Sequence, residues 1–159
     1  MAIRKRFDKE LHDKTDKLAK KKAIGILQGY KVVENPNRHA VDLLVYNEKD
    51  EYLFNCEVEI KTNWKKGEDF KYPDVNFLDR KAKYCKLEKP TIFMIFNEDL
   101  SQYLTVKGSD VLSSPQEIVK NKYCYDGELF YKLPLTKVKF NDVNSSIKEI
   151  IWMNAQPLE

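Results

Sequence analysis

Two apolar segments flank a short polar segment and predict a β-hairpin at the centre of the chain. The first apolar segment is 41–45, the polar segment is 47–50, and the second apolar segment is 52–60. Toward the end of the second segment apolar residues alternate with charged ones, so the charged side chains share one face of the predicted strand. These charged residues are Glu57, Glu59 and Lys61.

Helical patterns precede and follow the hairpin. Between Arg4 and Gln28 apolar residues recur at three-, four- and seven-residue intervals, which is typical of an amphipathic helix, and Gly29 predicts its end. Asn76 predicts the cap of a second helix, because apolar residues follow it at helical spacing. The opposite face of this second helix would carry Arg80 and other basic residues.

The remaining apolar segments predict further strands. The almost wholly apolar segment 90–96 is expected in the interior of a sheet, next to the strand that ends near Lys61. Asp126-Gly127 predicts the two-residue turn of a second hairpin. The other expected elements are strands at 30–33, 103–106 and 136–140, a turn or short helix at 108–114, and a closing helix from Val143 to Ile151.

The length and composition favour one intracellular domain. We expect a single domain over 1–159, with a core at about 4–107 and a carboxy-terminal hairpin and helix at about 115–154. The three cysteines form no Cys-x-x-Cys pair, so the sequence predicts a reducing, cytoplasmic location without a disulfide framework. No long apolar run predicts a membrane span, so we expect no membrane partner.

The charge of the chain is only mildly basic, with a net value of +3, but its distribution is uneven. Lysine and arginine side chains crowd the segment between Arg4 and Lys22, where four acids oppose them. A local positive field of this kind suits a nucleic-acid backbone. A solvated, lysine-rich helix face explains the same charges equally well.

Asp42 and Glu59 are candidate ligands of a divalent metal ion. Their carboxylates supply the hard oxygen atoms that Mg²⁺ prefers, with water and substrate phosphate completing the coordination. Lys61, two residues beyond Glu59, would hold an attacking water or stabilise negative charge in the transition state. The alternative is an exposed edge hairpin whose charged face is simply solvated. The apolar segment 43–45 favours an interior strand instead, and therefore a site.

At these residues the chain resembles the PD-(D/E)xK nuclease superfamily, which has a restriction-endonuclease-like fold and includes Holliday-junction resolvases. The match consists of Asp42 and of Glu59-Ile60-Lys61 at the end of a predicted strand, although Val41 stands in place of the motif's proline. The resemblance implies an α/β class with an α-β-β-β-α-β core, in which helices flank a central mixed sheet. It also implies a metal-dependent endodeoxyribonuclease that uses Mg²⁺, with Mn²⁺ as an alternative ion, and DNA as the partner.

The resemblance also implies roles for residues outside the motif. Glu10, on the first helix, is a candidate additional acid, but it is equally well explained as a solvated partner of Lys14. Arg80 or Lys81 would contact phosphate, unless the basic face of the second helix is merely solvated.

The loop after the motif and Glu57 each allow two interpretations. In the loop after the motif, Trp64, Lys65 and Lys66 would bind substrate by stacking and charge, or the aromatic residues would pin the loop to the core. Glu57 would be a second acid of the site or a salt-bridge partner of a basic residue on the second helix.

The leading hypothesis from the sequence is therefore a Mg²⁺-dependent, structure-directed endonuclease with Asp42, Glu59 and Lys61 at its centre. A second hypothesis is a nucleic-acid-binding or assembly module on the same fold without turnover. A third is an unrelated α/β protein with a fortuitous acid-x-Lys triplet. A homodimer, which would place two sites on two strands, is compatible with the first hypothesis.

Overall fold

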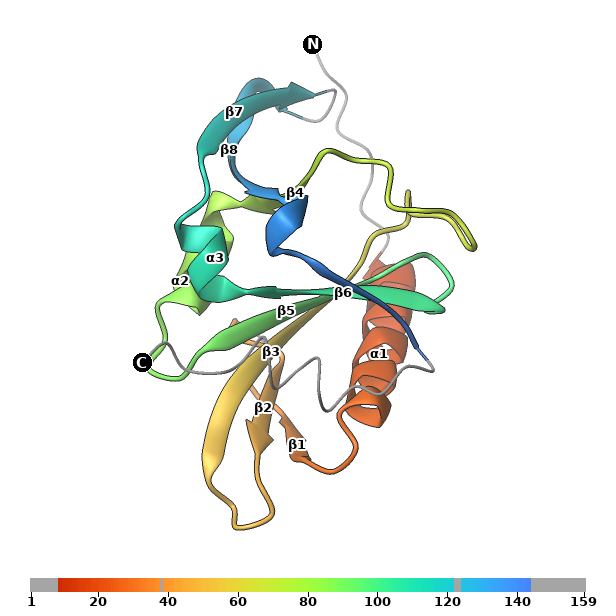
Figure 1. The fold of residues 1–159 in the computed structure, drawn as a ribbon, viewed down its shortest axis with the longest axis vertical. Coiled ribbons are helices and arrows are strands. Elements are labelled where there is room, and N and C mark those ends of the chain that lie inside the picture. Colours follow the sequence, from red (N-terminus) through yellow and green to blue (C-terminus); the bar gives the residue numbers. More distant parts are fainter. Residues whose placement is uncertain (1–8, 38, 122–123, 144–159) are drawn as a thin grey trace.

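The structure is a computed structural model that describes residues 9–37, 39–121 and 124–143 (Figure 1). Its helices are α1 (Lys9–Ile26), α2 (Ala82–Cys85) and α3 (Gly108–Leu112), with 3-10 turns η1 (Asp79–Lys81) and η2 (Leu135–Lys137). Its strands are β1 (Lys31–Glu34), β2 (Leu43–Tyr46), β3 (Tyr52–Ile60), β4 (Asp74–Leu78), β5 (Thr91–Phe96), β6 (Gln102–Lys107), β7 (Gln116–Asn121), β8 (Cys124–Pro134) and β9 (Lys139–Asp142). The predicted mixed α/β class is confirmed.

A six-stranded sheet in the order β1-β2-β3-β5-β6-β9 forms the centre of the molecule. β3 and β5 run parallel, and the other pairings of this sheet are antiparallel. Every residue of β5 is buried, as expected for an apolar run between two neighbouring strands. The predicted hairpin of β2 and β3, and the predicted interior place of 90–96 beside it, are confirmed.

Helix α1 covers one face of the central sheet (Figure 1). Ala19, Ala23 and Leu27 recur at four-residue spacing and are buried against apolar side chains of the sheet, such as Leu43 and Met94. The chain then turns at Gly29, whose positive φ of 102° ends the helical segment without the strain that a side chain would add.

The opposite face of the central sheet is covered by a three-stranded sheet in the order β4-β8-β7, together with α2 and α3. Phe77 of β4 meets Phe93 of β5 across this second core, with their ring centroids 4.9 Å apart. The central sheet is thus covered by α1 on one face and by a smaller sheet and short helices on the other. Polar side chains are therefore expected at its edges and at the ends of its strands.

The predicted helix from Asn76 is wrong at its beginning. Residues Asp74–Leu78 form strand β4, in which Val75 and Phe77 are buried and Asn76 is exposed. This alternation has the two-residue period of a strand, and pairing with β8 fixes it. Helical structure begins only at Asp79, where η1 leads into α2.

The predicted turn at Asp126-Gly127 is also wrong. Both residues lie within β8, and Asn121 of β7 already pairs with Cys124, so the two strands are connected before this dipeptide. Gly127 has a φ of 87° and lies beside a register shift in the β7–β8 pair. Gly127 therefore allows an irregularity within strand β8 and does not form a hairpin turn.

Four expectations for the carboxy-terminal half have different outcomes. The strand at 103–106 and the short helix after Gly108 are confirmed as β6 and α3. The last described strand, β9, begins at Lys139 rather than at 136, because η2 precedes it. Most of the expected closing helix, 144–151, lies outside the described residues.

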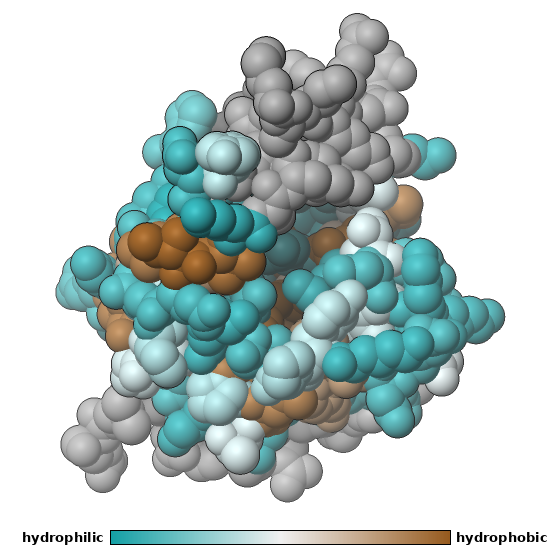
Figure 2. All heavy atoms as spheres, turned by 90° about the horizontal axis from the view of Figure 1, so that it is seen from above, coloured by the Kyte–Doolittle hydropathy of each residue, from teal (hydrophilic) through white to brown (hydrophobic). Residues whose placement is uncertain are grey.

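The β7–β8 pair extends beyond the central sheet (Figure 1). Ile118 and Tyr125 on these strands are 63% and 79% exposed, respectively. Figure 2, which looks onto this end of the molecule, shows a compact hydrophobic patch among hydrophilic side chains. Of the described helices, none is both long and apolar enough to cross a bilayer.

Candidate active site

The pairing of β2 with β3 brings Asp42 and Glu57 together. Leu43 lies opposite Cys56, so the preceding residue of β2 and the following residue of β3 face each other on the next rung. The backbone N–H of Asp42 donates to Glu57 Oε1 at 3.0 Å. In return, the backbone N–H of Val58 donates to Asp42 Oδ2 at 2.9 Å. Two carboxylates are thereby fixed at the same end of the hairpin.

Glu57 is a buried acid, with a side chain that is only 7% exposed. Its burial, together with the negative charge of Asp42, raises the pKa of Glu57 from 4.5 to about 7. Lys81 acts in the opposite direction, because its ammonium group favours the ionised carboxylate. Glu57 can therefore hold or release a proton near neutral pH, which is unusual for a glutamate and typical of functional sites.

Lys81 reaches Glu57 from a different part of the fold. It closes the 3-10 turn η1, and its Nζ lies 3.1 Å from Glu57 Oε2. Burial alone would lower the pKa of Lys81, but the charge of Glu57, its hydrogen bond to Lys81 and the charge of Glu59 together outweigh burial, so the pKa is raised. A charged ammonium group is thus held beside the acid pair, although Lys81 and Glu57 are 24 residues apart in the sequence.

Helix α1 adds a second cation at the rim of the site. Lys20 Nζ lies 3.0 Å from Asp16 Oδ2 and 3.6 Å from Asp42 Oδ1. The two acids outweigh the effect of burial and raise the pKa of Lys20. The charges consequently alternate in sign from Asp16 through Lys20 to Asp42, and from Glu57 to Lys81.

The two residues of the predicted acid-x-Lys triplet lie farther along β3 than the acid pair. Glu59 is exposed, one step beyond Glu57 on the same face of the strand. Lys61 follows the end of β3, and its Nζ lies over the ring of Tyr72, 5.4 Å from the centroid. The hairpin register thus sets Glu57, rather than Glu59, opposite Asp42, and η1 brings Lys81 to the position beside the acid.

The other predicted residues are distributed around this centre. Arg80 is exposed next to Lys81, as a phosphate contact requires. Lys65 and Lys66 are exposed on the loop after β3, and Lys65 forms a 2.9 Å ion pair with Glu98. Glu10 lies in the first turn of α1, but its side chain is outside the described part of the structure.

Trp64 does not present its ring to solvent. Its side chain is 3% exposed, and its indole N–H donates to the backbone oxygen of Glu68 at 3.0 Å. The ring also meets Phe70 and Phe140 edge to face. Of the two predicted roles for this loop's aromatic residues, the geometry of Trp64 supports pinning the loop to the core, and the expectation that it stacks on a base is corrected.

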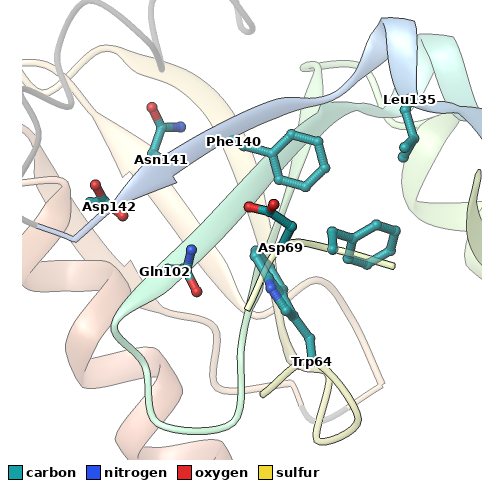
Figure 3. Close-up of a pocket in the computed structure, with 8 residues that line it drawn as sticks. Trp64, Asp69, Gln102, Leu135, Phe140, Asn141 and Asp142 are labelled. Carbon is teal, nitrogen blue, oxygen red and sulfur yellow. The ribbon is translucent and has the colours of Figure 1, made fainter. Parts of the chain in front are cut away.

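A cavity of about 350 Å³ lies beside Trp64, between the loop and β9 (Figure 3). Asp69 extends toward Phe140 in this cavity, and Asp142 and Gln102 lie at its other end. Neither carboxylate has a side-chain partner among the described residues. Two unpaired carboxylates disfavour a phosphate ligand, so this cavity is a poor candidate for the nucleic-acid site.

The acid pair offers carboxylate oxygen atoms, the ligand type that Mg²⁺ prefers, and each of these atoms already has a donor or a cation beside it. Among the described residues no three carboxylate, imidazole or thiol groups converge to hold a metal ion. However, Mg²⁺ commonly takes only one or two protein carboxylates and completes its shell with water and phosphate. Burial and, after it, the negative charge of Asp42 raise the pKa of Glu57, and a cation bound beside the two carboxylates would lower this pKa. Asp42 and Glu57 are therefore the residues that would hold it.

Comparison with protein-family models and with curated proteins assigns no family to this chain. No protein-family model matches the chain, and no curated protein matches it either.

Proposed function

We propose that this protein is a Mg²⁺-dependent nuclease that hydrolyses DNA phosphodiester bonds, on a restriction-endonuclease-like core. The observation that carries the proposal is the junction of Asp42, Glu57 and Lys81 at one end of the β2–β3 hairpin. Two carboxylates and a charged lysine are the groups that this chemistry needs, and none of the three residues belongs to either hydrophobic core.

The proposal differs from the sequence-based hypothesis in two residues. Glu57 replaces Glu59 as the acid opposite Asp42, because the strand register sets it there. Lys81 replaces Lys61 as the lysine beside that acid, because its Nζ lies 3.1 Å from Glu57 Oε2. Glu59 lies near enough to raise the pKa of Lys81 and would act as a further acid at the rim.

Each residue has a defined role in hydrolysis. A bound Mg²⁺ would offset negative charge on the phosphodiester and favour ionisation of an attacking water. Asp42 is oriented for ligation by the N–H of Val58, which leaves its Oδ1 near Lys20 at the mouth of the site. Lys81 holds positive charge where the pentavalent transition state gains negative charge. Glu57 binds or releases a proton near neutral pH, so the site is most negative, and most able to bind a cation, above pH 7.

Basic side chains around the centre suit a DNA backbone. Arg80 and Lys83 are exposed on η1 and α2, and Lys17 and Lys21 are exposed on α1. Two of these three elements, η1 and α1, also supply Lys81 and Lys20, the lysines that contact the acid pair. Contacts of this kind are independent of base sequence and are weakened by salt. A cytoplasmic location and a homodimer remain part of the proposal on the sequence alone.

The decisive experiment is a cleavage time course with supercoiled plasmid, linear duplex, single strands and a four-way junction, in Mg²⁺, Mn²⁺ or EDTA. Asp42→Asn is the test variant, because it keeps the shape of the side chain and removes its charge. Asp50→Asn is the matched control, because Asp50 lies at the turn of the same hairpin and its side chain pairs with the exposed Lys31. Cleavage that needs metal, and is lost in Asp42→Asn alone, is the expected result.

A non-catalytic DNA-binding module is the second candidate, and one observation favours it. Each carboxylate of the pair already has a cationic neighbour, Lys20 for Asp42 and Lys81 for Glu57. Such a network is also a stable structural arrangement. Metal-independent DNA binding that Asp42→Asn leaves unchanged, with no cleavage of any of the four substrates, would establish this alternative and exclude the nuclease.

A further inference from the structure

A cavity of about 450 Å³ lies directly beside the acid pair. Three segments line it, and each also supplies a residue of the candidate active site. The segment 39–41 leads into Asp42, Asn55 lies two residues before Glu57, and Lys83 and Tyr84 follow Lys81. The cavity therefore adjoins the acid pair, although Asp42, Glu57 and Lys81 do not themselves line it.

The strand register places the floor of the cavity on the same face as the acids. Leu44 pairs with Asn55, and the next rung on that face is Asp42 opposite Glu57. Val41, which is buried, continues this apolar floor. Tyr52 is fixed at its far end by a hydrogen bond from its hydroxyl to Asn55. A ligand on this floor would consequently reach the acid pair within a rung or two of the sheet.

The opposite wall combines apolar surface with positive charge. Tyr84 and Leu87 line this wall, and Leu87 is 43% exposed. Lys83 Nζ lies 4.9 Å from the centroid of the Tyr84 ring and donates to the backbone oxygen of His39 at 3.3 Å, which ties the two walls together. Lys89 also borders the cavity, with Glu88 as the single acid among its lining residues.

We propose that this cavity holds one unstacked nucleobase of a single-stranded or locally unpaired DNA. The assignment rests on the proposed nuclease function, because it places the adjoining phosphate of the same strand at Asp42, Glu57 and Lys81. Lys81 and Lys83 both lie over the ring of Tyr84, so Tyr84 contributes cavity wall rather than a free stacking face. The apolar floor and the apolar wall of Tyr84 and Leu87 suit a flat base, and lysines at the rim suit the backbone on either side of it. A paired, stacked base in a duplex has no face free to enter.

The cavity is large enough for a nucleobase, and its position next to the acid pair suits a base of the strand that is cleaved. Its volume falls in the range of small-molecule pockets. The contact of Lys83 Nζ with the backbone oxygen of His39 joins the two walls of the cavity. The substrate class that follows is DNA with an exposed base next to the scissile phosphate, such as a single strand, a flap or a bulge.

Fluorescence anisotropy in EDTA tests this proposal without requiring cleavage. The probes are three labelled oligonucleotides of equal length: a single strand of deoxyadenosine, an abasic strand with the same backbone charge, and the corresponding duplex. The wild-type protein is expected to bind the single strand at least about tenfold more tightly than either of the others, since burial of one base against apolar side chains contributes a factor of this order.

Variants assign that preference to the cavity. Tyr84→Ala should abolish the preference for the single strand over the abasic strand, whereas Tyr84→Phe should keep it. Tyr84 also packs against the second core, so Leu87→Ser is a further variant at an exposed position, which trims the cavity wall without disturbing the core. Tyr125→Ala, on the distant β8, is the control for loss of an exposed aromatic residue.

Equal binding of the three oligonucleotides, or a preference that survives in both Tyr84→Ala and Leu87→Ser, would overturn the assignment. Addition of Mg²⁺ to the same single strand then tests the nuclease separately. Base-dependent binding through the cavity without cleavage would refute the proposed hydrolysis and keep the base site. Cleavage with no dependence on a base would refute the base site and keep the nuclease.

Discussion

Asp42 donates its backbone N–H to Glu57 Oε1 at 3.0 Å, while its own side chain accepts a hydrogen bond from the N–H of Val58. Both carboxylates are thus held by hydrogen bonds from backbone N–H groups, and not by side-chain contacts alone. Because each carboxylate is oriented by a main-chain donor, their separation is a property of the hairpin. Lys81 reaches this rigid pair from a different element and completes it.

The first prediction concerns which lysine serves the site. Lys81→Met, which removes the charge and keeps most of the apolar stem, should lower the cleavage rate by about 100-fold or more, as expected for loss of an electrostatic group at the reacting centre. Loss of the ammonium should also raise the pKa of Glu57 further, so the rise of the rate with pH should move to higher pH. Rates measured between pH 5 and pH 9 check both effects.

Lys61→Met is the matched variant for this comparison. Lys61 lies over Tyr72, and the acid beside it on β3 is exposed, so we expect only a small change in rate and no change in the pH profile. A large loss in Lys61→Met with a normal rate in Lys81→Met would restore the acid-x-Lys triplet of the sequence and refute the assignment of Lys81.

The second prediction concerns stability and pH. The pKa of Glu57 is about 7 in the folded protein and 4.5 as its ordinary value, so the folded state binds the extra proton between these values. Stability from this group is complete below about pH 4.5 and is lost as pH rises to about 7, a change on the order of 3 kcal/mol. Urea denaturation at several pH values measures it.

Glu57→Gln should flatten this part of the stability profile, because the amide does not titrate. Glu59→Gln, at the exposed neighbour on the same face, should leave the slope as in the wild type. If the free energy of unfolding of the wild type and of Glu57→Gln changed in parallel from pH 4.5 to pH 7, the assignment of the raised pKa to Glu57 would be wrong.

A third prediction compares two glycines. Gly127 has a φ of 87°, and a Cβ there would lie 2.6 Å from Ile118 Cγ2, so Gly127→Ala should reduce stability by more than about 1 kcal/mol. Gly25 in α1 has open space around it, and Gly25→Ala should add about 0.5–1 kcal/mol. Urea midpoints of the two variants should move in opposite directions, and a shift of both in the same direction would contradict the account.

The fourth prediction separates structural from ligand-binding aromatic residues. Trp64 is 3% exposed, so Trp64→Ala should reduce the free energy of unfolding by about 3–5 kcal/mol. Tyr125 is 79% exposed, and Tyr125→Ala should change it by no more than about 0.5 kcal/mol. Thermal and urea denaturation supply the comparison. A Trp64→Ala protein of normal stability and weakened DNA affinity would return the indole to the substrate-binding residues.

The central sheet was predictable because its signal is local. The alternation from Cys56 to Ile60 and the apolar run 90–96 identify β3 and β5 without knowledge of their partners. Strand β4 was missed because Asn76 resembles a helix cap, and the partner that makes Asp74–Leu78 a strand is β8, more than fifty residues later. Tertiary pairing here overrides the local helix signal.

The acid pair could not be assigned from the sequence because it depends on one irregularity. The register of the hairpin shifts between Val45 and Tyr46, so Tyr46 pairs with Tyr52 while Leu43 pairs with Cys56. With the Tyr46 register throughout, Asp42 would lie opposite Cys56 instead of Glu57. The sequence allows a salt bridge between Glu57 and a basic residue of the second predicted helix, and Lys81 forms this salt bridge.

The parallel pairing of β3 with β5 affects the order in which the two acids and Lys81 come together during folding. Parallel neighbours cannot be joined by a tight turn, so the chain leaves β3 at Ile60, traverses β4, η1 and α2, and returns at Thr91. The hairpin with its two acids is a local structure, whereas Lys81 belongs to this long excursion. Loop closure over such a distance is entropically demanding and slows folding. During refolding the acids should therefore be in place before their lysine, and catalytic competence should lag behind formation of the hairpin.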